Sequence, residues 1–187
     1  MYQSKGKEMF IMANNCFYSM KIIGTKKNCE RFVQKLEDYE VPNHFWRFFS
    51  VDVYDKSDAY DEPINEDNYE MYICGDCAWS LETCCRASGY SEGVDLFEVN
   101  TRELELKLEA WSEETGMGFQ EHYIYDNGKC LTDVCLDIGS YWWDRDEYPT
   151  YEEFKEDFPD APDEEKFGDE EEVVLGGFGS DFEEWHI

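Results

Sequence analysis

The chain has 187 residues, of which 16 are Lys or Arg and 45 are Asp or Glu, so its formal net charge at pH 7 is −29. With 42% hydrophobic and 17% aromatic residues, it is too apolar for a disordered polyelectrolyte, and we expect one folded core. The charge argues against direct binding of DNA or RNA over a broad surface, because such binding needs Lys and Arg to neutralise phosphates. It predicts a basic partner instead.

No stretch approaches the roughly 20 apolar residues that span a bilayer, and residues 1–12 lack the apolar run of a signal peptide. We therefore expect a cytoplasmic protein. In that compartment cysteines are mostly reduced, and small buried side chains are their usual role. The eight cysteines are Cys16, Cys29, Cys74, Cys77, Cys84, Cys85, Cys130 and Cys135.

The first elements are predicted by alternation and capping. Residues 15–23 alternate as a strand that Gly24 ends, and Thr25 is the expected N-cap of a following helix. One face of that helix would carry Cys29, Phe32, Val33 and Leu36. Residues 48–54 and 69–73 alternate again and predict a strand pair joined by an acidic loop over residues 55–68.

The second half continues this pattern. A short helix is predicted around residues 94–101. The composition of residues 103–111 favours helix, but Leu104, Leu106, Leu108 and Ala110 recur at period two, which favours a half-buried strand. Residues 119–125 and 129–137 predict two more strands, joined by a tight Asn127-Gly128 hairpin.

The resulting order β-α-β-β-α-β-β-β predicts an α+β fold: a ferredoxin-like, mostly antiparallel sheet with two helices, an added C-terminal hairpin and an acidic tail. We expect a domain over residues 1–143 and an acidic C-terminal helix and tail over residues 144–187. The second region holds 3 basic and 18 acidic residues. Aromatic spacing predicts a short helix over residues 151–158. The rest is either a solvated flexible end or a segment that folds onto a basic groove.

Three local strings stand out: Asn14-Asn15-Cys16, residues 75–80 (GDCAWS) and residues 112–123 (SEETGMGFQEHY). Together they resemble the YubB-like, ferredoxin-like proteins of plasmids and phages, over residues 12–143. The resemblance implies the fold and a mobile-element setting, in which small acidic proteins are often antagonists of host defence, including anti-CRISPR proteins. It implies no catalytic mechanism and leaves the acidic tail unexplained.

Two alternatives rest on local residue clusters. The Cys74-x-x-Cys77 spacing, with Cys84-Cys85 or Cys130 and Cys135, fits a zinc-binding structural adaptor domain, although strand cysteines that face different environments give the same spacing. Glu113, Glu114, Glu121 and His122 would suit a metal-dependent nuclease or nucleotide-processing enzyme. With 45 carboxylates in the chain, some lie near any histidine by chance. The common phosphate-loop, serine-hydrolase and zinc-protease motifs are absent.

The leading hypothesis is a non-enzymatic inhibitor whose carboxylates stand where phosphates would, in the Lys- and Arg-lined channel of a CRISPR nuclease in a bacterial host. Aromatic residues beside acids, as at 141–144, are either the base of a core or an interface hot spot. We expect no catalytic residue, no cofactor, no bound metal, no direct nucleic-acid contact and no membrane contact. The predicted partner-binding residues are Asp61, Glu62, Glu66, Asp67, Trp142, Trp143, Asp144, Asp169, Glu170, Glu171, Glu172, Glu183, Glu184 and Trp185.

Overall fold

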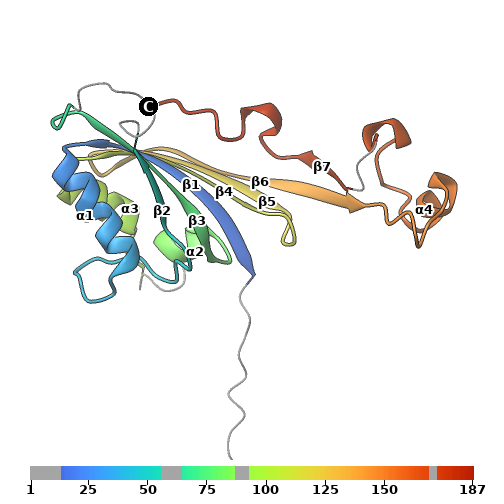
Figure 1. Ribbon diagram of the computed structural model, residues 1–187, viewed down its shortest axis with the longest axis horizontal. Coiled ribbons are helices and arrows are strands. Elements are labelled where there is room, and N and C mark those ends of the chain that lie inside the picture. The colour runs from blue at the N-terminus through green and yellow to red at the C-terminus, as the bar shows by residue number, and fades with distance from the viewer. Residues whose placement is uncertain (1–13, 56–64, 87–92, 169–171) are drawn as a thin grey trace, which may run out of the picture.

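A seven-stranded antiparallel sheet with the strand order β2-β3-β1-β4-β5-β6-β7 organises the computed structural model, which describes residues 14–55, 65–86, 93–168 and 172–187 (Figure 1). The strands are β1 (Asn15–Gly24), β2 (Asp52–Asp55), β3 (Tyr69–Ala78), β4 (Lys107–Glu114), β5 (Phe119–Asp126), β6 (Lys129–Trp142) and β7 (Glu172–Gly176). The α-helices are α1 (Lys26–Glu37), α2 (Leu81–Cys85), α3 (Leu96–Glu103) and α4 (Tyr151–Asp157), and single 3₁₀ turns lie at Glu164–Lys166 and Gly179–Asp181. The mixed α+β class predicted from the sequence is confirmed.

Strand β1 and helix α1 form as their sequences predict. Every second side chain of β1 from Cys16 to Ile22 is fully buried toward the helices. Thr25 caps α1, because its hydroxyl accepts a hydrogen bond from the Asn28 backbone N–H at 3.3 Å. The predicted helix face is buried at Cys29, Phe32 and Leu36.

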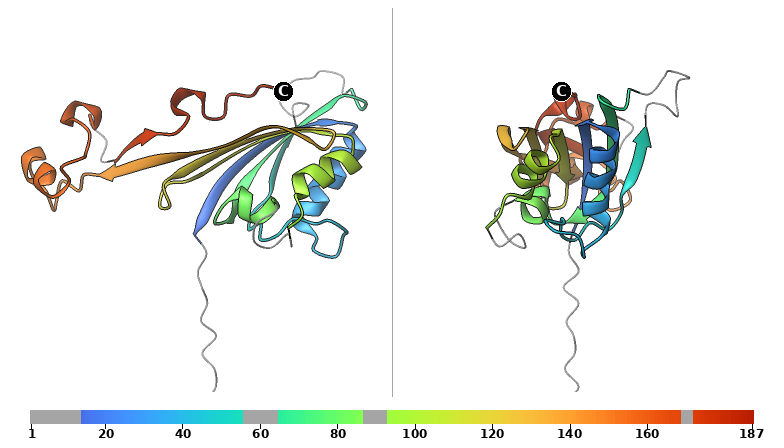
Figure 2. Two further views of the ribbon diagram at one scale, coloured as in Figure 1. Left: turned by 180° about the vertical axis from the view of Figure 1, so that it is seen from behind. Right: turned by 90° about the vertical axis from the view of Figure 1, so that its left-hand side faces the viewer.

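Helices α1, α2 and α3 cover one face of the sheet (Figures 1 and 2). Helix α1 packs on β1 and β3, and α3 packs on β4, β5 and β6. The two longer helices are also joined directly: the Lys35 ammonium lies 3.3 Å from the Glu103 carboxylate, and the Asn28 amide donates to the Leu104 carbonyl at 2.7 Å. No helix of the described residues is long and apolar enough to cross a membrane.

Several strand boundaries differ from the predicted ones: β2 begins at Asp52 and not at residue 48, and β3 and β6 run beyond residues 73 and 137. Residues 78–80 look like continued strand, but β3 ends at Ala78, and Ser80 caps the five-residue helix α2 by accepting from the Thr83 N–H at 3.0 Å. A helix of this length is too short to show a 3.6-residue period. The segment from 103 to 111 is split, since Glu103 ends α3 and β4 begins at Lys107. Glu105 between them has a φ of 53°, so the chain turns there.

The Asn127-Gly128 hairpin is confirmed. The two residues have φ values of 47° and 81°, as a type I′ turn requires. A Cβ atom on Gly128 would also lie 2.5 Å from Cβ of Arg102 in α3. Both the backbone conformation and the approach of α3 therefore require glycine.

The acidic C-terminal region forms a second, small core. Trp143, Phe154, Ala161 and Phe167 are buried there, with Tyr141, Tyr148, Tyr151 and Val173 packed around them. We call residues 143–168 the arm; it lies at the far end of β6, away from α1 (Figure 1). The predicted helix is present as α4, which begins with a capping box between Thr150 and Glu153.

The chain then returns to the sheet. Strand β7 pairs with the end of β6, Ile138 opposite Gly176 and Trp142 opposite Glu172. Residues 177–187, which we call the strap, run back along the sheet face opposite the helices (Figures 1 and 2). The sequence predicted neither β7 nor the strap. Of the two expected forms of the tail, the solvated flexible end is wrong for residues 172–187, because they contact strands far away in the chain.

Candidate functional site

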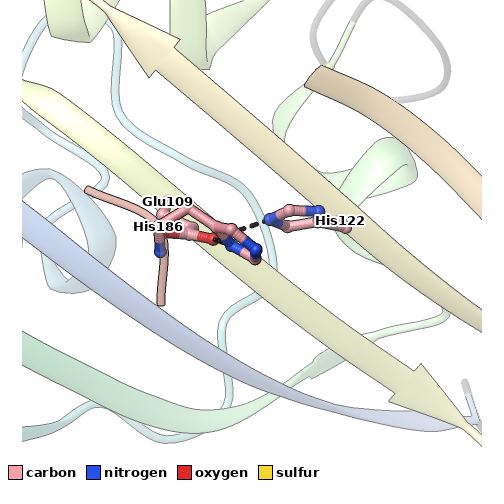
Figure 3. Close-up of side chains that lie close together, drawn as sticks. All are labelled: Glu109, His122 and His186. Atoms are coloured by element: carbon pink, nitrogen blue, oxygen red, sulfur yellow. Dashed lines mark hydrogen bonds and ion pairs between the residues drawn. The ribbon is translucent and has the colours of Figure 1, made fainter. Parts of the chain in front are cut away.

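The strap covers a cluster of three side chains on this second face of the sheet (Figure 3). Glu109 comes from β4, His122 from β5 and His186 from the strap. Both histidines contact the same carboxylate oxygen: His122 Nε2 and His186 Nδ1 each lie 2.8 Å from Glu109 Oε1. Their ligand-type atoms all lie within 4.8 Å of one another.

Glu109 is the centre of the cluster and is completely buried. Its second oxygen, Oε2, accepts the backbone N–H groups of His186 at 2.6 Å and Ile187 at 3.2 Å. Burial alone raises the pKa of this carboxyl group, but the hydrogen bonds from His122 and His186 outweigh it, so the pKa of Glu109 lies below its usual value. The carboxylate is therefore held ionised beneath the strap.

The ring of His122 is held in one plane by aromatic neighbours. It stacks on Trp111 with a centroid separation of 3.6 Å and an interplanar angle of 5°. Phe178 and Phe182 of the strap meet the Trp111 ring edge-on at 4.9 and 5.5 Å. These rings exclude water from one side of the cluster and leave His122 with only 6% of its surface exposed.

His186 is the accessible member of the cluster, since 49% of its side chain is exposed. The hydrogen bond to Glu109 raises the pKa of His186 above its ordinary value, and the nearby Glu184 and Asp181 carboxylates act in the same direction. Lys21, opposite Glu109 in the β1–β4 register, is directed elsewhere: its ammonium donates to the Ile187 carbonyl and lies 3.8 Å from Glu70.

Further contacts fix the strap along its length. The Phe178 N–H donates to the side-chain carbonyl of Gln120 at 2.9 Å. Gly177 precedes it with a φ of 64°, and a Cβ atom there would lie 2.2 Å from Gln120 Oε1 and 2.5 Å from Ile138 Cγ2. Glycine is therefore required where the strap leaves β7.

The residues of the alternative metal-dependent enzyme site, Glu113, Glu114, Glu121 and His122, form no common metal-binding group among the described residues. His122 lies under the strap, whereas Glu121 points to the helix side of the sheet. There its carboxylate accepts from the Leu81 N–H at 2.8 Å, the Ser112 hydroxyl at 2.5 Å and the Tyr123 hydroxyl at 3.0 Å. Burial raises the pKa of Glu121 despite these hydrogen bonds. Glu121 thus joins α2 to β4 and β5.

The alternative zinc knuckle at Cys74 and Cys77 is not formed either. Cys77 is fully buried on the helix side, whereas Cys74 is half-buried on the other side of β3. Two residues three apart in a strand face opposite sides of the sheet, so these thiols cannot bind one ion. In the described part of the chain, the Glu109, His122 and His186 cluster is the one group with metal-binding geometry.

Glu109 and His186 were missed by the sequence analysis. In the alternating segment Glu109 falls on the side expected to face solvent, but the strap buries that side. His186 stands 77 residues later, and no spacing rule connects the two. The chain has only three histidines, and this scarcity was the one available signal.

The predicted partner-binding residues lie in three places. In the loop before β3, Glu66 and Asp67 are exposed, and the Glu66 carbonyl accepts from the Lys26 N–H at 2.9 Å. Glu183 and Glu184 are exposed on the strap, where Trp185 is half-buried and meets Tyr72 edge-on at 5.8 Å. Asp61, Glu62, Asp169, Glu170 and Glu171 lie outside the described residues, as does the side chain of Glu172.

At the base of the arm the aromatic pair is divided. Trp142 is 56% exposed, whereas Trp143 is 5% exposed. The Trp143 indole N–H donates to the Tyr148 carbonyl at 2.8 Å, so its ring is part of the small core and presents no face to a partner. Asp144 is half-buried and accepts the Asp146 N–H at 2.9 Å. The core interpretation therefore holds for Trp143, and the structure leaves Trp142 as the exposed ring.

The arm carries its charge on ordered backbone. It contains 11 acidic and 3 basic residues. Two of these bases are directed to backbone carbonyls: Arg145 donates to Gly168 at 2.8 Å, and Lys155 donates to Ala161. Glu152 and Glu156 of α4 are exposed. The arm is consequently a projecting, strongly acidic surface.

Comparisons of the chain with protein-family models, with curated proteins and with solved structures found no match.

Proposed function

We propose that this chain is an acidic, non-enzymatic inhibitor from a mobile element that binds a basic, nucleic-acid-binding host defence protein, a CRISPR nuclease, by nucleic-acid mimicry. It acts in the bacterial cytoplasm and binds neither nucleic acid nor membrane. The observation that carries the proposal is the arm. Its 11 acidic and 3 basic residues are carried by a segment that folds around a small core of its own.

Two physical effects support this function. A net charge of −29 steers the protein toward a positively charged channel and raises the association rate. The small core holds α4 in place before binding, so less conformational entropy is lost in the complex than with a disordered acidic tail. Trp142, exposed beside these acids, supplies the kind of aromatic contact that dominates interface energetics.

The strand order supports the finer assignment of the fold. Strands β2, β3, β1 and β4 are adjacent in that order, and helices α1 and α3 lie in the two crossovers, before β2 and before β4. This order is typical of ferredoxin-like sheets and supports that assignment, with β5, β6 and β7 as additions. The proposal thus includes a ferredoxin-like frame and, with it, membership of the YubB-like proteins.

The test is competition with DNA for purified, guide-loaded CRISPR nucleases. Binding of a fluorescent target duplex to each nuclease is measured at several salt concentrations while the full chain is added. We expect displacement at low salt that weakens as salt rises, because exposed charges are screened. Lysozyme, a basic protein without a nucleic-acid channel, serves as the control for nonspecific attraction.

Two variants with the same net charge locate the contact. The arm variant is E152Q/E156Q/E164Q/E165Q. The control variant, at exposed positions of the main body, is E30Q/E37Q/E40Q/E105Q. If exposed ion pairs contribute 0.2–1 kcal/mol each, the arm variant weakens competition by about 0.8–4 kcal/mol, at least about fourfold. Equal losses in both variants, or no displacement from any nuclease, would contradict the proposal.

A further inference from the structure

We infer that Glu109, His122 and His186 form a binding site for a divalent first-row transition metal ion of the zinc type, which fastens the strap to the sheet. This goes beyond the proposed function, since the site lies on a different surface from the arm.

The donor set fits such an ion. Two imidazoles and one carboxylate are a common ligand set for zinc and for other late first-row ions. Mg²⁺ and Ca²⁺ prefer oxygen ligands, and the two nitrogens select against them. Three protein ligands leave a further position, which a water molecule occupies in sites of this kind.

The three ligand atoms already lie near the spacing that such an ion requires. Zinc–ligand bonds of about 2.0–2.2 Å place two ligand atoms of a tetrahedral ion about 3.3 Å apart. The two nitrogens now lie 2.8 Å from Glu109 Oε1, and all three atoms lie within 4.8 Å of one another. An ion inserted between them replaces two hydrogen bonds by three metal bonds, after each nitrogen moves about 0.5 Å away from Oε1 and the two nitrogens approach each other by up to about 1.5 Å.

The surroundings supply the support that metal ligands normally have. Stacking on Trp111 orients the His122 ring, and the backbone N–H groups of His186 and Ile187 hold the second Glu109 oxygen. Among the described residues on the same face, Ser19 Oγ and Trp111 Nε1 are buried without a hydrogen-bond partner. Lys21, the cation opposite Glu109 in the β1–β4 register, is directed to Ile187 and Glu70.

The site has a mechanical consequence. Glu109 and His122 belong to adjacent central strands, whereas His186 belongs to the strap. A bound ion therefore links the C-terminal segment to the sheet by coordinate bonds in addition to the contacts of Phe178 and Phe182. Because the three ligands meet only when the strap lies on the sheet, a bound ion stabilises the docked strap by mass action.

The test is a titration of the purified, reduced full chain with Co²⁺ and then Zn²⁺, without any partner protein. We expect about one equivalent of Co²⁺ to give weak visible bands without a thiolate band in the near ultraviolet, and Zn²⁺ to displace it. Zn²⁺ should also slow hydrogen exchange over residues 178–187. His186→Gln, at a half-exposed position that folding tolerates, should lose at least about tenfold in affinity.

His44→Gln is the matched control, because His44 is the remaining histidine of the chain and lies outside the cluster. It should bind Co²⁺ as the parent does. The inference is overturned by absence of Co²⁺ and Zn²⁺ binding, by unchanged affinity in His186→Gln, or by a thiolate band that assigns the ion to cysteines. None of these outcomes depends on whether the arm binds a nuclease.

Discussion

Replacement of Phe154 by alanine tests whether the arm is a separately folded unit. The Phe154 side chain is fully buried and touches five aromatic rings at centroid distances of 4.9–6.1 Å. Removing a buried Phe costs about 3–5 kcal/mol. The core of the arm contains only four buried hydrophobic residues, so this loss is a large share of the local stability, whereas the main core is untouched.

We therefore expect Phe154→Ala to open the arm without unfolding the sheet. Hydrogen exchange followed by mass spectrometry should show protection over residues 143–168 falling by about a hundredfold or more, the equivalent of about 3 kcal/mol. Protection in β1, β3 and β4 should remain close to that of the parent chain. Competition for the nuclease should weaken in parallel, because the carboxylates of α4 lose their fixed positions.

Phe158→Ala is the matched control on the same segment, since Phe158 is 41% exposed. It should cost about 1 kcal/mol and leave most of the arm protected. The reasoning is refuted if protection of the arm is unchanged in Phe154→Ala. It is equally refuted if β3 loses protection by the same factor, because the arm and the sheet would then unfold as one cooperative unit.

Four further outcomes are expected. Glu121→Ala leaves its former donors unpaired and should lower the urea unfolding free energy by about 3 kcal/mol, and Glu121→Gln by less. Gly177→Ala should raise hydrogen exchange in the strap while β3 stays protected, because the new Cβ meets Gln120 and Ile138. Hydrogen bonds from Asn43 and Lys35 outweigh burial and lower the pKa of Glu103. The ionised Glu103 carboxylate therefore stabilises the folded protein above pH 4.5, and this contribution is lost as the pH falls through the lowered pKa. Glu103→Gln should cost about 1 kcal/mol at pH 7, where solvent screens the half-exposed carboxylate, and almost nothing in acid, as equilibrium unfolding would measure. Iodoacetamide should label the exposed Cys130 and Cys135 first, whereas buried Cys29, whose pKa burial raises to about 12, stays unmodified without denaturant.

Local rules were sufficient to predict three features of the sheet and its first helix. The alternation in β1, the Thr25 cap of α1 and the Asn127-Gly128 turn each depend on residues within one element or one turn. Such signals are complete in the sequence, because the residues that satisfy each other are neighbours in the chain. The helix α4 was predictable for the same reason, from the spacing of its aromatic residues.

Tertiary structure decided which residues form the candidate sites. Glu109 and Lys107 point to the same side of β4. Lys107 is exposed there, whereas Glu109 is buried because the strap covers it. Trp142 and Trp143 are adjacent and chemically identical. At the end of β6 the first side chain is exposed to solvent, whereas the second is buried in the small core of the arm. The sequence by itself determined the longer strands, the helices α1, α3 and α4 and the charge, but not α2, β7 or the strap. The pairing of Glu109 with His186 depends on a path of 77 residues that no local preference encodes, since it is selected by the packing of Phe178 and Phe182 on Trp111.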